Sequence, residues 1–273
     1  MKQSVHPISE CLRLSPKNPY ILANSIELFA RNSFVVLAHQ PVVPHLMTVL
    51  KIVHFSDILC VWAYIGQSNL QKLTDEFGPS IKVETRFCSV FPNAQGKIEK
   101  MWSDRGGFDG YADHVRQVVE GFPTTELHVD VWTRTRPKSS ASPHLFVKAL
   151  ELVKSDDDEG PPERSIALEA TRELRSAFFV KGEDVSDWVI QKQISRRLSV
   201  DFDEIRSKIE TGEAIARLAG DYELAQSMNV RGSPTYILND GRQILFGNVS
   251  YAILKANVSE LLSEQQDLNA TPC

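Results

Sequence analysis

The chain lacks the features that mark several classes of protein. It has 273 residues but only 4 cysteines, too few for a small domain held together by disulfides. No apolar run approaches the roughly 20 residues that a membrane-spanning helix needs. Its 30 Lys and Arg residues are outnumbered by 35 Asp and Glu residues, and no basic block stands out. We therefore expect neither nucleic acid nor a membrane as the partner.

Motifs for metals and nucleotides are missing as well. The sequence has no Cys-x-x-Cys, His-x-x-x-His or Gly-x-Gly-x-x-Gly element, so we expect no metal site and no bound nucleotide. The N-terminus does not read as a secretory signal peptide, because its one apolar stretch is too short. Together with the low cysteine count, this favours the reducing cytoplasm as the compartment.

The first 46 residues differ from the rest. They carry five of the 14 prolines (Pro7, Pro16, Pro19, Pro41 and Pro44) and show no periodic pattern. We expect residues 1–46 to be a disordered extension. Since a strand pattern begins directly after Met47, we also hypothesise that Met47 is the true translation start.

Regular elements become readable after this segment. The β-branched run 49–55 predicts a strand, the spacing from Cys60 to Phe77 predicts a helix that ends at Gly78, and 81–87 predicts a second strand. A strand, a helix and a strand within this length form a βαβ unit, whose two strands run parallel with a right-handed crossover.

The remaining chain is mostly helical and then returns to strand. Between residues 96 and 228 the clearest helices are 143–154, 164–179, 186–198 and 213–228, and 127–132 is an ambiguous strand-like segment. Strands over 235–238 and 242–246 flank Asn239-Asp240-Gly241, a strong hairpin signal. A last amphipathic helix begins after Asn248 or Ser250 as N-cap.

This order is that of an α/β thioredoxin-like fold with a large inserted helical domain. We expect the thioredoxin-like domain over 47–95 and 229–266, the insertion over 96–228 and a flexible tail over 267–273.

Cys60 is the first candidate for chemistry. It lies where the first strand gives way to a helix, and unpaired N–H groups and the positive end of the dipole at a helix N-terminus stabilise a thiolate. We therefore interpret Cys60 as a nucleophile. The alternative is a buried, inert cysteine, which is the common structural role of this residue.

Ser233-Pro234 is the second candidate. Proline lacks an N–H and is tolerated only at the start of a strand or at an edge, so Pro234 marks a bend before the strand. If this peptide bond is cis, the backbone of Ser233 is expected to remain free to pair with an extended peptide.

These residues carry a resemblance. Residues 55–66 (Phe-Ser-Asp-Ile-Leu-Cys-Val-Trp-Ala-Tyr-Ile-Gly) resemble the active-site stretch of the DsbA-like thioredoxin superfamily, especially its FrnE-like cytosolic branch. Residues 181–187, 225–238 and 246–248 resemble further stretches of that branch, so the likeness covers about residues 48–262. It implies a thioredoxin fold, a cis-proline loop at Pro234 and thiol–disulfide chemistry at Cys60.

The chain departs from that family at Ala63, where the family has its second cysteine. A dithiol releases its substrate by attack of the second thiol, whereas a lone Cys60 must wait for an external thiol. Kappa-class glutathione transferases and chromene-carboxylate isomerases resemble the same layout. They bind glutathione at this sheet end and usually carry Ser at the first position.

Three further residues receive roles by position. We expect Trp62 at the rim of the site and Asn248 as a helix N-cap that could also meet a glutathione carboxylate. Cys88 ends the second strand, and we interpret it as a core cysteine, with a displaced second thiol as the alternative.

The leading hypothesis is a monothiol thiol–disulfide oxidoreductase that acts on thiol- or disulfide-containing proteins or on small thiols. It would have no bound cofactor, with glutathione as a possible co-substrate, and would be a monomer or a homodimer. The alternatives are a glutathione-dependent transferase or isomerase, and a non-catalytic peptide-binding or chaperone-like protein.

Overall fold

The computed structural model describes residues 49–154 and 165–270. The predicted extension 1–46 and the hypothesis about Met47 lie outside these residues. Within them, no helix is both long and apolar enough to cross a membrane.

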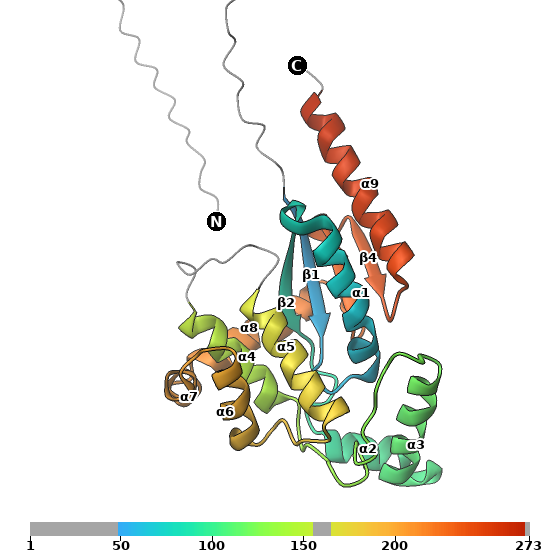
Figure 1. Ribbon diagram of the computed structural model, residues 1–273, viewed down its shortest axis with the longest axis vertical. Helices are drawn as coiled ribbons and strands as arrows, with labels where there is room; N and C mark the ends of the chain where they lie inside the picture. The colour runs from blue at the N-terminus through green and yellow to red at the C-terminus, as the bar shows by residue number, and fades with distance from the viewer. Residues whose placement is uncertain (1–48, 155–164, 271–273) are drawn as a thin grey trace, which may run out of the picture. The chain divides into compact units, whose positions relative to one another are not determined.

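A mixed four-stranded sheet forms the centre of the fold (Figure 1). Its strands are β1 (Leu50–Ser56), β2 (Ile81–Phe87), β3 (Thr235–Leu238) and β4 (Gln243–Phe246), in the order β2-β1-β3-β4. β1 and β2 run parallel, while the β1–β3 and β3–β4 pairs are antiparallel. The βαβ unit and the hairpin are confirmed, with boundaries within one residue of those predicted.

Helices cover both faces of the sheet. On one face, Ile52 packs with Leu70 of α1 (Val61–Phe77) and Leu254 of α9 (Tyr251–Ala270). On the other face, Phe55 packs with Ala225 of α8 (Glu213–Ser227). Successive side chains of a strand point to opposite faces, so β1 contributes to both cores and is buried along almost its whole length.

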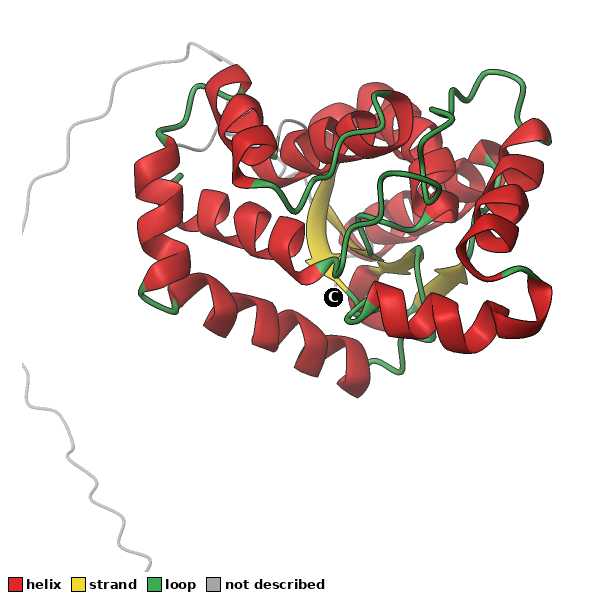
Figure 2. Ribbon diagram, turned by 90° about the horizontal axis from the view of Figure 1, so that it is seen from below, coloured by secondary structure: helices red, strands yellow, loops and turns green. Residues whose placement is uncertain are grey.

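The inserted segment is helical, as predicted (Figures 1 and 2). Its helices are α2 (Ala94–Trp102), α3 (Gly107–Glu120), α4 (Ala141–Val153), α5 (Ile166–Arg175), α6 (Trp188–Arg197) and α7 (Phe202–Glu210). A π-helical turn, Ser176–Val180, extends α5. Short 3₁₀ turns at Gly78–Ser80, Ser103–Arg105 and Asn239–Gly241 complete the described elements.

The strand-like segment 127–132 does not form a strand. The Asp130 carbonyl accepts hydrogen bonds from the backbone N–H groups of Thr133, Arg134 and Thr135, which closes a series of turns. Trp132 adopts a left-handed backbone with φ 62° and is completely buried. Burial of the Trp132 ring in the helical core therefore overrides the β propensity of this segment.

The largest apolar cluster joins the helical insertion to the turn after β1. It includes Phe146, Leu174, Phe178 and Ile194 of the insertion together with Leu59 and Cys60. The chain segment that carries Cys60 is thus packed into the core of the inserted domain.

Candidate active site

Cys60 is the N-cap residue of α1, with an extended backbone at φ −82° and ψ 115°. Its N–H donates to the Asp57 carbonyl at 3.2 Å, which closes a tight turn between β1 and α1. The predicted strand-to-helix junction is therefore present at Cys60.

The carboxylate of Asp57 fixes this turn. It is fully buried and accepts hydrogen bonds from the Leu59 N–H at 2.9 Å and from the N–H groups of Val90 and Phe91 at 3.0 Å each. The hydroxyl of Ser140 donates to it as well, at 2.7 Å. One acidic side chain thus ties the turn at Cys60 to the segment after β2 and to the start of α4.

The structure brings Ser233 into direct contact with Cys60. The Cys60 thiol donates to the Ser233 carbonyl, with 3.3 Å between Sγ and O, and the Asp57 N–H donates to the Ser233 hydroxyl at 2.9 Å. The Ser233–Pro234 peptide bond is cis. The expectation that the backbone of Ser233 is free is wrong for its carbonyl, because the thiol already occupies it.

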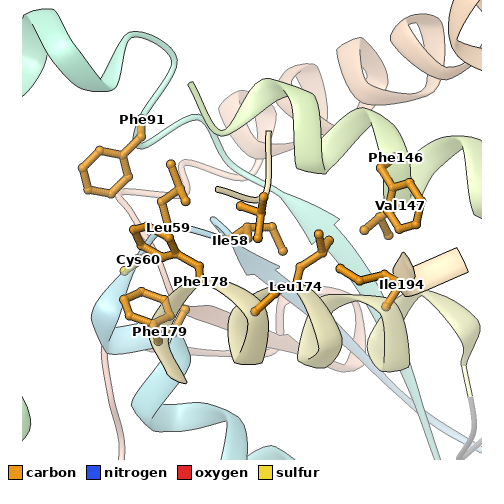
Figure 3. Close-up of a cluster of buried hydrophobic side chains, with 14 of the residues drawn as sticks. Ile58, Leu59, Cys60, Phe91, Phe146, Val147, Leu174, Phe178, Phe179 and Ile194 are labelled. Atoms are coloured by element: carbon orange, nitrogen blue, oxygen red, sulfur yellow. The ribbon is translucent and has the colours of Figure 1, made fainter. Parts of the chain in front are cut away.

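The protonation of Cys60 differs from the sequence-based expectation. Burial raises the pKa of the Cys60 thiol, although the side chain of Ser233 and the backbone N–H groups of Ala63 and Trp62 lower that pKa in part. The side chain is 7% exposed. In Figure 3 it lies at the end of the apolar cluster that holds Phe91 and Phe179. The helix N-terminus thus acts in the predicted direction, but desolvation is larger and favours the neutral thiol.

A pocket of about 620 Å³ opens in front of Cys60. Its wall includes Cys60, Trp62, Cys88 and Ser233. Trp62 is 39% exposed and meets Phe122 edge to face, with ring centroids 6.3 Å apart. Trp62 therefore lies both at the pocket wall and in packing contact with the helical insertion.

Among the described residues, the pocket wall carries the basic side chains of Lys97 and Arg231 but no acidic side chain. Lys97, His114 and Arg231 line it, together with several aromatic rings, and none of its described lining residues is Asp or Glu. In a chain with a net charge of −5, this wall favours a ligand with negative charge and some apolar surface.

Cys88 lies in the same pocket wall but is also a core residue. It is 6% exposed, packs with Val53 and Ala225, and donates its N–H to the Ser56 carbonyl at 3.1 Å. Burial raises the pKa of its thiol, and the nearby Asp57 and Cys60 raise it further. Both Cys60 and Cys88 are free thiols.

The structure places Asn248 away from the pocket wall. The helix α9 begins at Tyr251, and the Ser250 carbonyl accepts from the Leu254 N–H at 3.2 Å. The N-cap is therefore Ser250, and the role of Asn248 as N-cap is wrong. The Asn248 Oδ1 atom is buried beside Gly66 of α1 and has no hydrogen-bond partner among the described residues.

Sequence reasoning missed a histidine beneath the site. His144 of α4 is fully buried, its Nε2 accepts the Ile58 N–H at 3.2 Å, and its Nδ1 lies 3.3 Å from the Tyr222 hydroxyl in the pocket wall. Burial lowers its pKa to about 4, so the ring is neutral, with its proton on Nδ1. A separation of 86 residues from Ile58 left no local signal for this contact.

Among residues 49–154 and 165–270, no group of three or more His, Cys, Asp or Glu side chains is arranged to hold a metal ion.

Comparison with known proteins supplies the family context. A sequence model described as the DSBA-like thioredoxin domain matches residues 162–259. None of the curated proteins compared with the chain matches it.

Solved structures share the fold at low sequence identity. A candidate protein disulfide isomerase from Nitrosomonas europaea superposes with a TM-score of 0.62 at 12% identity, covering 80% of this chain and 98% of that one. The cytosolic disulfide reductase DsbM from Pseudomonas aeruginosa gives 0.57 at 18%, covering 80% and 99%. A 2-hydroxychromene-2-carboxylate isomerase gives 0.55 at 15%, covering 80% and 98%. The shared architecture shows that the chain has a thioredoxin-like fold with a helical insertion, and residues 162–259 are similar to the DSBA-like thioredoxin domain.

Proposed function

We propose that this protein catalyses monothiol thiol–disulfide exchange at Cys60, with a small thiol such as glutathione as co-substrate. The observation that carries the proposal is the position of the Cys60 sulfur, which lies in the pocket wall and 3.3 Å from the carbonyl of the cis-proline loop. The pocket volume of about 620 Å³ is that of a small-molecule site.

The proposed reaction has two exchanges. The Cys60 sulfur attacks one sulfur of a disulfide, a Cys60–substrate mixed disulfide forms, and the other sulfur leaves as a thiol that takes up the Cys60 proton. Because Ala63 offers no second thiol, an external thiol then attacks the substrate sulfur of the mixed disulfide. This step returns the Cys60 thiol and releases a new disulfide, so no further oxidant is needed.

The raised pKa of Cys60 sets a condition on this chemistry. Only the thiolate attacks a disulfide, so the rate should increase with pH up to and beyond the ordinary cysteine range. A substrate that displaces the Ser233 carbonyl or brings positive charge would increase the thiolate fraction.

One observation favours a second candidate. A neutral Cys60 that donates its S–H, as it does to Ser233, could donate to a bound glutathione thiolate instead. In that case the protein would be a glutathione-dependent transferase or isomerase. The absence of a second cysteine at Ala63 fits this candidate equally well, and the non-catalytic peptide-binding alternative requires neither activity.

We place the activity in the cytoplasm, where reduced glutathione could regenerate Cys60. Support comes from the free thiols of Cys60 and Cys88 and from the similarity to DsbM, which is described as cytosolic and has been solved with GSH. The substrates would be thiol- or disulfide-containing proteins or small thiols, and the protein would act as a monomer or a homodimer.

The test is formation of a glutathione mixed disulfide. The wild type, Cys60→Ser and Cys88→Ser are incubated with oxidised glutathione between pH 7 and 9.5, and adducts are located by peptide mass spectrometry. We expect an adduct on Cys60 in the wild type and in Cys88→Ser, at a rate that rises with pH, and none at position 60 in Cys60→Ser.

Absence of a Cys60 adduct at every pH would overturn the exchange proposal. If glutathione then raised the melting temperature of the wild type and of Cys60→Ser alike, the transferase alternative would be favoured. Ala63→Cys provides a gain-of-function comparison. It should form an intramolecular disulfide with Cys60 and release bound substrate without external thiol.

A further inference from the structure

Arg175 reaches beneath the turn that carries Cys60. It is the last residue of α5, and its side chain is buried, with 1% exposed. Its Nη2 donates to the Ser56 hydroxyl at 2.8 Å and to the Asp57 carbonyl at 3.4 Å. That carbonyl is also the acceptor of the Cys60 N–H. The guanidinium group and Cys60 thus share one acceptor atom.

The charge of Arg175 has no carboxylate partner in the described part of the chain. Besides Ser56 and Asp57, its only acceptor there is the side-chain oxygen of Gln67, 3.4 Å from Nη1, and none of the three acceptor groups is ionised. Its Nε has no partner among the described residues. Burial of a cation without a carboxylate partner is unfavourable, so this arrangement lowers stability unless an anion forms nearby.

The carboxylate nearest in sequence is otherwise engaged. The carboxylate of Asp57 accepts hydrogen bonds from Leu59, Val90, Phe91 and Ser140. Only the backbone carbonyl of Asp57 accepts a hydrogen bond from Arg175. Arg175 therefore makes no direct ion pair with the Asp57 carboxylate.

We propose that Arg175 is a positioning residue that supplies the counter-charge for the Cys60 thiolate and holds the turn beneath it in place. This inference rests on the proposed function of Cys60. The helical insertion would then act directly on the thiol through the end of α5, rather than only forming a wall of the pocket.

Several other ionisable groups lie around Cys60. Burial lowers the pKa of Arg175 only to about 10, so the guanidinium is charged at neutral pH, and the interaction with Cys60 is the largest effect that opposes this shift. Asp57 in the same turn disfavours the thiolate. Cys88 and Tyr111 face Cys60 in neutral form, because burial raises the pKa of each. The remaining cationic or titratable groups of the pocket wall are Lys97, His114, Tyr222 and Arg231.

The test measures how the rate of Cys60 alkylation by iodoacetamide depends on pH, followed at the peptide level. We compare the wild type with Arg175→Met, Arg175→Gln and Arg175→Lys. The two neutral variants should raise the apparent pKa of Cys60 by about one unit and slow alkylation at pH 8 about tenfold. Arg175→Lys keeps the positive charge, so the rise in the apparent pKa of Cys60 should be at most half as large as in the neutral variants.

Arg172→Met is the matched control. Arg172 precedes Arg175 by three residues in α5. Its side chain donates a hydrogen bond to Gln71 of α1 and not to the turn at Cys60. It should leave the alkylation profile unchanged. Removing a buried unpaired charge need not destabilise a fold, and chemical denaturation identifies the variants that remain folded.

Two outcomes would overturn the proposal. The first is an unchanged apparent pKa of Cys60 in a folded Arg175→Met or Arg175→Gln variant. The second is an apparent pKa of Cys60 in Arg175→Lys that is raised as much as in Arg175→Met. Alkylation needs no disulfide substrate, so this result is independent of glutathione adduct formation. The role of Arg175 and the proposed exchange reaction can therefore fail separately.

Discussion

At the scale of single residues, the site is governed by a competition between burial and hydrogen bonding. Cys60 has the helix N-terminus that usually activates a thiol, yet its surroundings are apolar and its pKa is raised. Such a thiol is protected from unspecific oxidation, since reactivity follows thiolate content and exposure. Activation would then depend on what enters the pocket.

His54 is a second residue whose pKa is set mainly by burial. It is 2% exposed, stacks on Tyr236 with ring centroids 4.8 Å apart, and neither ring nitrogen has a partner among the described residues. Burial, followed by the charge of Arg175, lowers its pKa to about 3. The ring therefore stays neutral in the folded protein at pH values where it is charged in the unfolded chain.

This difference predicts a pH-dependent stability. As pH falls from 6.5 toward 3, the unfolded state binds a proton at His54 before the folded state does, so the free energy of unfolding decreases. His54→Phe keeps an aromatic ring beside Tyr236 and removes this linkage. Urea denaturation should show that the loss of stability between pH 7 and pH 4.5 is about 2 kcal/mol smaller in the variant. An equal loss in both proteins would show that His54 does not carry the effect.

At the scale of secondary-structure elements, close packing around α1 orients the site. A Cβ atom on Gly66 would lie 3.2 Å from the Asn248 Oδ1 and 3.3 Å from the Tyr236 hydroxyl. The absence of a side chain at Gly66 therefore lets α1, which begins directly after Cys60, lie close to the sheet and to the segment before α9.

A matched pair of glycines tests this packing. Gly220 is exposed in α8, and a Cβ atom there would meet nothing within 4 Å. Gly220→Ala should raise the free energy of unfolding by about 0.5–1 kcal/mol through helix propensity. In Gly66→Ala the close contacts of the new Cβ atom should outweigh the gain in helix propensity. The free energy of unfolding, measured by chemical denaturation, should then fall by about 1 kcal/mol. A stabilised Gly66→Ala variant would refute the tight approach.

At the scale of the whole described domain, a buried ion pair links the insertion to the sheet. Lys148 of α4 lies 2.9 Å from the carboxylate of Asp221 in α8, and its ammonium group also donates to the Thr85 carbonyl of β2 at 3.0 Å. Asp221 accepts from Arg86 and from the Phe87 N–H of the same strand. Three elements far apart in sequence thus meet at one carboxylate.

Breaking this link should be costly. Asp221→Ala removes the fully buried one of the two carboxylates that contact the Lys148 ammonium and leaves only Glu151, at 3.0 Å. We expect a loss of about 3 kcal/mol in the free energy of unfolding. The double variant Asp221→Ala/Lys148→Met should lose less than the sum of the two single variants, because each single variant already removes the contact between these two side chains. Additive losses in this double-mutant cycle would mean that the two side chains do not interact.

The sequence by itself determined the local elements. The β-branched run before Ser56, the helix that ends at Gly78, the strand Ile81–Phe87 and the hairpin around Asn239–Gly241 agree with the structure. Turn chemistry and hydrophobic periodicity depend on near neighbours in the chain, so a single sequence suffices for them. The same locality explains the error at 127–132, where packing of the Trp132 ring overrides propensity.

Only the tertiary structure decided the chemical state of the site. The ring of His144 in α4 and the guanidinium group of Arg175 in α5 reach the turn at Cys60 from up to 118 residues away. The protonation of Cys60 depends on how much water these segments exclude. Desolvation is a property of the assembled core and leaves no local pattern in the sequence, which is why the position of Cys60 was predictable but its pKa was not.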